Sequence, residues 1–110
     1  MPKSLPANCV PLMGPHHARK LIQQLARNTS RIAWSRHALD RMVERDIIDR
    51  VVIDVLRTGY VKGEIEPGKG PGEWKAKVCK EVKGRREVGV VTIVMRAKRL
   101  FVKTVEWEDL

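Results

Sequence analysis

The sequence predicts an α+β fold in which N-terminal helices pack on a four-stranded antiparallel sheet, in the manner of a two-layer domain. Three observations support this fold class: a helical apolar period before Gly59, an alternating period after it, and short connections between the alternating segments. The length of 110 residues is usual for one domain. We therefore expect an irregular Pro-rich lead segment over residues 1–15 and a single α+β domain over residues 16–110.

Three amphipathic helices are predicted before Gly59. The first begins around Pro15, a favourable residue for a first turn, and continues for about three turns. The second covers Arg36 to about Arg45, with Ser35 as its N-cap. The third is expected to be capped by Asp49 and to end at Gly59, which is a typical helix stop.

Four strands are predicted after the third helix: Tyr60 to Ile65, Glu73 to Val82, Glu87 to Val94, and Leu100 to Trp107. Their short connections favour a simple meander. The third strand is apolar on both faces and is expected at the centre of the sheet. In the second strand Trp74 shares its face with Ala76 and Val78, so we expect it in the core. The short Ile32 to Trp34 piece is interpreted as a connection that leads into the second helix.

The charge of the chain predicts a polyanionic partner. The formal net charge is +9 at pH 7, and residues 69–103 contain eleven Lys or Arg against three Glu. Such an excess favours phosphate neutralisation with release of counterions. Composition alone does not separate nucleic acid from a membrane surface or an acidic protein, so the choice of RNA depends on the motifs below.

Composition also argues against several other classes of protein. No apolar run approaches the roughly 18 to 20 residues that span a bilayer, and the N-terminus lacks a signal-peptide core. A cytoplasmic protein without a membrane partner is therefore expected. Cys9 and Cys79 do not have the spacing of metal ligands, so we expect no disulfide, no metal site and no other cofactor.

The second predicted helix carries the residues best suited to chemistry. His37, Arg41 and Arg45 follow one another at intervals of four, which places an imidazole and two guanidinium groups on one helix face. Guanidinium binds phosphate oxygens in a fork, and histidine exchanges protons near neutral pH. On spacing alone the alternative stays open: Asp40 and Glu44 would pair with the arginines, and His37 would merely border the core.

The same stretch resembles a known family. It contains Ser35, His37, Ala38, Arg41, Met42, Arg45 and Ile47, followed by Leu56 and Gly59 at the end of the next helix. This pattern looks like that of a small bacterial domain family grouped with the RelE/BrnT-type toxins, over about residues 32–107. The resemblance implies a compact ribonuclease fold, cleavage of messenger RNA, and frequently an acidic antitoxin partner. The lead segment and the first helix lie outside the pattern.

Our hypothesis for the mechanism needs no metal. A 2′-hydroxyl would attack the adjacent phosphate and leave a 2′,3′-cyclic phosphate and a 5′-hydroxyl. His37 is the candidate for proton transfer. Arg41 and Arg45, with Arg85 or Arg86, are expected to stabilise the pentacoordinate phosphorane.

A second set of residues is predicted to bind the nucleic-acid backbone: Lys75, Lys77, Lys83, Arg85 and Arg86. The alternative is a solvated strand face whose lysines discourage aggregation at a sheet edge. The acidic ending, with Glu106, Glu108 and Asp109, is expected to fold back on this face and lower its effective charge. Tyr60 either exchanges a proton at the site or simply begins the first strand.

Three functions therefore compete. The first is a toxin-type, metal-independent endoribonuclease that acts on RNA. The second is a basic nucleic-acid-binding module without catalysis, and the third is an interaction protein that docks an acidic partner. The first is the only one that uses His37, Arg41 and Arg45 as a unit, and it is our prediction. The oligomeric state is not predicted.

Overall fold

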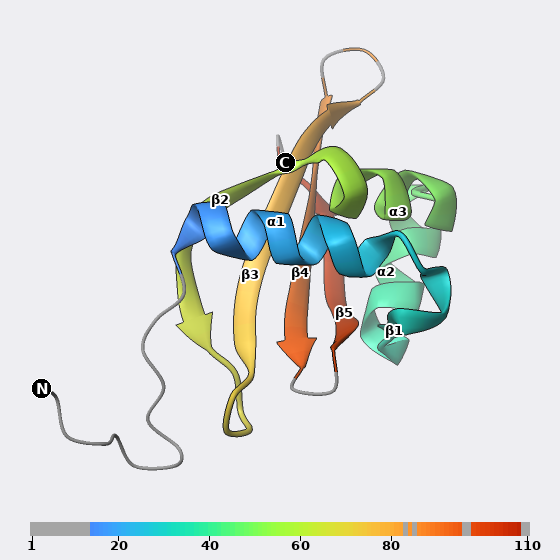
Figure 1. Ribbon diagram of the computed structural model, residues 1–110. Helices are drawn as coiled ribbons and strands as arrows, with labels where there is room; N and C mark the ends of the chain where they lie inside the picture. The colour runs from blue at the N-terminus through green and yellow to red at the C-terminus, as the bar shows by residue number, and fades with distance from the viewer. Residues whose placement is uncertain (1–13, 83, 85, 96–97, 109–110) are drawn as a thin grey trace, which may run out of the picture.

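The structure, a computed structural model, describes residues 14–82, 84, 86–95 and 98–108. It is an α+β domain in which three α-helices lie on one face of a five-stranded mixed sheet (Figure 1). The predicted four-stranded antiparallel sheet is therefore wrong. A fifth strand, β1 (Ile32–Trp34), lies between the first and second helices and pairs in parallel with the last strand. The helices are thus not all gathered ahead of the sheet.

The other four strands form the expected antiparallel meander. They are β2 (Tyr60–Pro67), β3 (Trp74–Val82), β4 (Arg86–Met95) and β5 (Arg99–Trp107). The order across the sheet is β1-β5-β4-β3-β2, so the strand that is apolar on both faces is central, as predicted. The short β1 escaped prediction because three residues are too few to show an alternating period.

The helices are α1 (Pro15–Ala26), α2 (Arg36–Arg45) and α3 (Asp49–Thr58), with a short 3-10 turn at Thr29–Arg31. The Ser35 cap is confirmed, because its Oγ accepts a hydrogen bond from the Ala38 amide at 2.9 Å. The Asp49 cap is wrong, since Ile48 holds the N-cap position and no side chain caps α3. Within the described ranges, no helix has the length and apolar character needed to cross a membrane.

The core lies between the sheet and the helices. Residues that pair across adjacent strands share a face, so Trp74, Ala76 and Val78 point the same way as Val90 and Val94. All five are buried, which confirms Trp74 as a core residue. Helix α1 packs on β2 and α3, while α2 packs against β5 (Figure 1).

Gly59 joins α3 to β2 where two backbones come very close. A Cβ built on Gly59 would lie 2.5 Å from the Val55 carbonyl oxygen and 2.6 Å from that of Cys79. Real Cβ atoms do not approach backbone so closely, and neither carbonyl belongs to a flexible group. Only glycine lets the end of α3 sit directly on β3.

Candidate nucleic-acid interface

The side chains of α2 point in three directions. Ala38 and Met42 are buried and form the core face of the helix. His37, one residue before Ala38, is exposed, and its imidazole makes no hydrogen bond or ion pair with any other residue in the described ranges. The packing of the core therefore does not use the imidazole, and His37 borders the core only through its buried neighbours, as in the alternative interpretation.

Arg41 follows His37 one turn later and is partly exposed. Its guanidinium forms an ion pair with Glu44, and its side chain is 35% exposed. Asp40 pairs instead with Arg36, at 3.5 Å, outside the predicted stripe of His37, Arg41 and Arg45. Asp40 and Glu44 thus both pair with arginines at helical spacing, as the alternative expected, although Asp40 pairs with Arg36 and not with Arg41 or Arg45. Exposed pairs of this kind contribute about 0 to 1 kcal/mol, so a phosphate can replace Glu44 at little cost.

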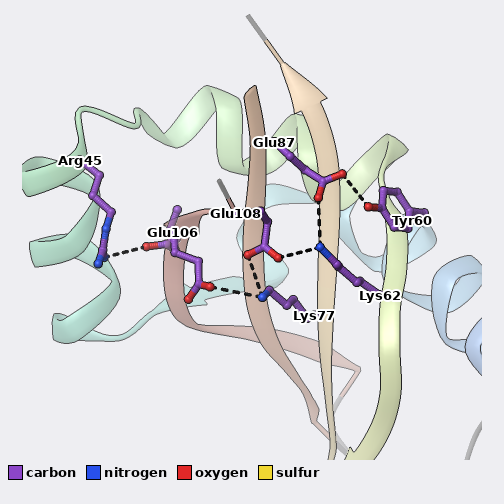
Figure 2. A network of polar contacts seen from close by, with 8 residues as sticks. Arg45, Tyr60, Lys62, Lys77, Glu87, Glu106 and Glu108 are labelled. Atoms are coloured by element: carbon purple, nitrogen blue, oxygen red, sulfur yellow. Dashed lines mark hydrogen bonds and ion pairs between the residues drawn. The ribbon is translucent and has the colours of Figure 1, made fainter. Parts of the chain in front are cut away.

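Arg45 has a different environment from Arg41. Its Nη1 donates to the Val105 carbonyl oxygen at 3.2 Å, and its own carbonyl accepts from Trp107 Nε1 at 3.0 Å. Figure 2 shows the Arg45 guanidinium at the edge of the sheet beside Glu106. Arg45 therefore ties the C-terminal end of α2 to β5, and the structure does not join it with His37 and Arg41 into one open cluster.

The N-terminal turn of α2 is held by the same strand. The Ser35 amide donates to Val102 O at 3.0 Å, and its hydroxyl donates to Lys103 O at 2.9 Å. A β-bulge at Lys103 interrupts the register between β4 and β5 at this contact. The amides of Arg36 and His37 have no acceptor among the described residues, so the helix N-terminus presents donors to an anion.

A hollow of about 300 Å³ opens on the sheet face that carries no helix. Ile93, Met95 and Phe101 form its apolar floor, and Lys69, Glu73 and Lys103 stand at its rim. Lys103 is common to this hollow and to the N-terminal turn of α2, because it lines the hollow and its carbonyl accepts from the Ser35 hydroxyl. An aromatic ring with lysines around it is a surface on which a nucleic-acid base can stack.

The other half of the helix-free sheet face carries paired charges. Lys62 Nζ lies 3.3 Å from Glu87 Oε1 and 3.1 Å from Glu108 Oε1. Lys77 Nζ lies 3.2 Å from Glu106 Oε2 and 2.7 Å from Glu108 Oε2 (Figure 2). We call these five residues the charge network. The predicted basic face is therefore largely neutralised here.

Gly89 makes room for the Glu108 carboxylate in the charge network. A Cβ on Gly89 would lie 2.4 Å from Glu108 Oε2. The Glu108 side chain is 7% exposed, and its amide donates to Glu87 O at 2.8 Å. Lys77 Nζ, 2.7 Å away, compensates the charge on Glu108 Oε2. The expected fold-back of the acidic ending is confirmed for Glu106 and Glu108, while Asp109 lies outside the described residues.

The charge network shifts the protonation of its members. Burial by itself would raise the pKa of Glu108, but the ion pairs with Lys77 and Lys62 outweigh it and lower that pKa. Bonds to Glu108 and Glu87 raise the pKa of Lys62. Burial opposes charge on Lys77, yet its two glutamate partners leave its pKa raised. The charges of Glu108, Lys62 and Lys77 are thus favoured at neutral pH.

Two neighbours of the charge network are held in their protonated forms. The Tyr60 hydroxyl donates to Glu87 Oε2 at 2.6 Å, and this bond, aided by burial, raises the pKa of Tyr60 to about 12. Burial, and then the charges of Glu108 and Glu87, raise the pKa of the Cys79 thiol to about 12. Tyr60 therefore acts as a hydrogen-bond donor rather than as a base.

Cys79, Glu87 and Glu108 each place one potential metal ligand within 4.8 Å of the others. However, the ammonium groups of Lys62 and Lys77 already compensate the two carboxylates, and the thiol favours its protonated form. A divalent cation would have to displace these positive charges and the thiol proton. The residues present fit an internal ion network better than a metal centre.

The predicted backbone-binding residues do not form one surface. Lys75 pairs with Glu66 at 3.0 Å, and Lys77 belongs to the charge network. Arg86 pairs with Val82 and so lies on the opposite, helix-covered face, with its guanidinium 3.9 Å from the centroid of the Trp107 ring. Lys83 and Arg85 lie outside the described residues.

Several residues of this face were not singled out from the sequence. Lys62 lies two residues after Tyr60 in β2, so the alternation of side chains along a strand places both on the same, open face. This spacing is the one signal in the sequence for Lys62. Gly89, inside a strand of β-branched residues, signals a close approach by another group. Nothing in the sequence reveals that Lys103 sits on a bulge beside Ser35.

Comparison with protein families places these elements in context. A family model described as a domain of unknown function, DUF4258, matches residues 34–107. The chain belongs to the DUF4258 family. The DUF4258 match includes α2, α3 and the meander but not α1, and it contains His37 and every member of the charge network except Glu108. Searches of curated proteins and of solved structures found no match.

Proposed function

We propose that this DUF4258 protein is a metal-independent endoribonuclease of the toxin type, acting on RNA in the cytoplasm. One observation carries the proposal. The N-terminal turn of α2 presents the exposed His37 imidazole beside two unused backbone amides, with Arg41 one turn further along. None of these groups is needed by the core, and together they suit a phosphodiester.

In this proposal the 2′-hydroxyl attacks the adjacent phosphorus while a base removes its proton, and the 5′-oxygen leaves with a proton from an acid. His37 takes part in one of these transfers, for which general acid–base catalysis typically supplies about 10² to 10⁴-fold. Arg41 releases Glu44 and binds the phosphorane, while the Lys103 ammonium adds positive charge. A neighbouring base stacks on Phe101 in the adjoining hollow. Arg45 acts indirectly, by holding α2 against β5.

The test is incubation of purified protein with a defined RNA in EDTA, with the product ends mapped. Wild type is compared with His37→Ala and Arg41→Ala. Arg36→Ala is the matched control, because Arg36 is exposed on the same helix but pairs with Asp40 off the stripe. Cyclic-phosphate ends, lost in the first two variants and kept in the control, would support the proposal. Intact RNA at every concentration, with and without ribosomes, would reject it.

A second candidate function rests on a specific observation. A catalytic histidine is normally oriented by a hydrogen bond to a third group, and His37 has no such partner among the described residues. A binding module needs no orientation of the imidazole. In that case His37→Ala would leave RNA affinity unchanged, whereas Arg41→Ala and Lys103→Ala would each weaken binding and reduce the salt slope by about one unit.

A further inference from the structure

The flank of α2 that faces away from His37 and Arg41 carries exposed apolar side chains. Leu39 is 44% exposed and Val43 is 83% exposed, and they lie four residues apart on the helix. Ile48, which precedes α3, is 56% exposed. We call these three residues the apolar strip. Three of the four large hydrophobic residues that are exposed among the described residues belong to it, which is more than scattered surface hydrophobicity.

A hollow of about 470 Å³ lies along the apolar strip, between α2 and the start of α3. Its apolar lining is completed by Met42 and Ile47. The charged residues that line it are Asp46 and Asp49, both exposed, and neither carboxylate pairs with another described residue. A hollow whose charged lining residues are both carboxylates is unexpected on a chain of charge +9.

We propose that the apolar strip docks an amphipathic helix of a partner protein, one whose apolar stripe is flanked by Lys or Arg. The stripe would fill the hollow in the usual helix-in-groove manner, and the basic flank would pair with Asp46 and Asp49. Nucleic acid is repelled by these carboxylates. A second copy of the chain, packed about a two-fold axis through the strip, would bring like carboxylates together.

This inference does not depend on the ribonuclease proposal. The apolar strip and the His37–Arg41 flank are on opposite sides of α2, so a helix bound to the strip leaves the N-terminal turn of α2 free. It also differs from an acidic partner on the sheet face, which would have to displace Glu106 and Glu108 from Lys77. Binding to the strip is measured without RNA, so either proposal can fail alone.

The experiment uses the full chain and two designed peptides of about four helical turns. Both carry Leu at helical spacing; one has Lys at the flanking positions and the other has Glu. Fluorescence anisotropy at low salt should show the Lys peptide binding about tenfold more tightly than the Glu peptide. Val43→Ser should weaken binding of the Lys peptide about fivefold without lowering the Tm, since Val43 is almost fully exposed.

Charge variants and mapping decide the outcome. Asp46→Asn with Asp49→Asn should reduce the difference between the two peptides. Asp40→Asn should not, because Asp40 pairs with Arg36 outside the hollow. Amide NMR shifts should concentrate in residues 39–49. Equal binding of both peptides, shifts elsewhere, or a wild-type dimer that Val43→Ser dissociates would overturn the proposal, the last by showing that a second copy covers the strip.

Discussion

At the scale of single residues, two arginines of the same predicted stripe have different structural roles. Arg41 is partly exposed and its ion pair with Glu44 is local to the helix. Arg45 instead donates to a backbone carbonyl of β5, and this charged hydrogen bond is partly shielded from water. Sequence spacing treats the two as equivalent, while their surroundings make one available to a ligand and the other structural.

We expect this difference to appear in stability. Arg45→Met should lower the free energy of unfolding by about 1.5 to 3 kcal/mol, the usual value of a hydrogen bond to a charged group. Arg41→Met should change it by less than about 1 kcal/mol. Urea unfolding of the two variants measures both values. Equal losses would show that Arg45 does not anchor the helix.

Gly59 gives a second prediction at this scale. Gly59→Ala would push a methyl group against two backbone carbonyls, which neighbouring side chains cannot relieve. We expect a loss of about 1 to 3 kcal/mol, as in other overpacked sites. Gly14→Ala is the control, because nothing lies within 4 Å of its added Cβ. The comparison fails if the urea midpoints of the two variants coincide.

At the scale of elements, α2 is attached to β5 through its first turn. The Ser35 hydroxyl both accepts from the Ala38 amide and donates to Lys103 O, so one oxygen caps the helix and attaches it to β5. Asp49 makes no corresponding cap on α3. Two residues that look equally suited to capping thus differ in effect.

Ser35→Ala should therefore destabilise the protein by about 1 to 2 kcal/mol, the upper part of the range for a lost cap. Asp49→Ala should cost less, roughly 0.3 to 1 kcal/mol, because only its interaction with the helix dipole is lost. Thermal unfolding of both variants is the measurement, and a larger loss for Asp49→Ala would contradict the geometry.

The elements also show what the sequence can predict. Helices and meander strands with several residues of one period were placed within one or two residues, because periodicity reports which face is buried. The strand β1 was not, since its partner Leu100–Val102 is far away in the chain and its three residues have no period. The candidate site was found only in part: the helix face of His37 and Arg41 follows from spacing, but the pairing of Lys77 with Glu106 and Glu108 depends on strand register.

At the scale of the whole molecule, the charge network joins β2, β3, β4 and the end of β5, so pH should act on the entire sheet. Glu108 has a lowered pKa, so its contribution is present above its ordinary value of 4.5 and is lost as pH falls below it. Tyr60 has a raised pKa, so its contribution is present below 10.0 and is lost as pH rises toward about 12. Stability should therefore decline at both ends.

Unfolding midpoints in urea, measured across pH at constant ionic strength, test this expectation. Glu108→Gln should flatten the acid decline, because it removes the titrating carboxylate. Tyr60→Phe should flatten part of the alkaline decline and leave the acid side unchanged. An acid decline that is identical in wild type and Glu108→Gln would show that the network does not link pH to folding.

The attachment of α2 to the last strand has a consequence for synthesis of the protein. Arg45 and its acceptor on Val105 are separated by 60 residues, and Ser35 and Lys103 by 68. At roughly 5 to 20 residues per second, a ribosome needs about 3 to 12 s to add the strand that α2 requires. During that delay α2 lacks the strand to which its two ends are attached. Any activity that depends on the position of this helix is therefore withheld from the nascent chain until β5 has emerged.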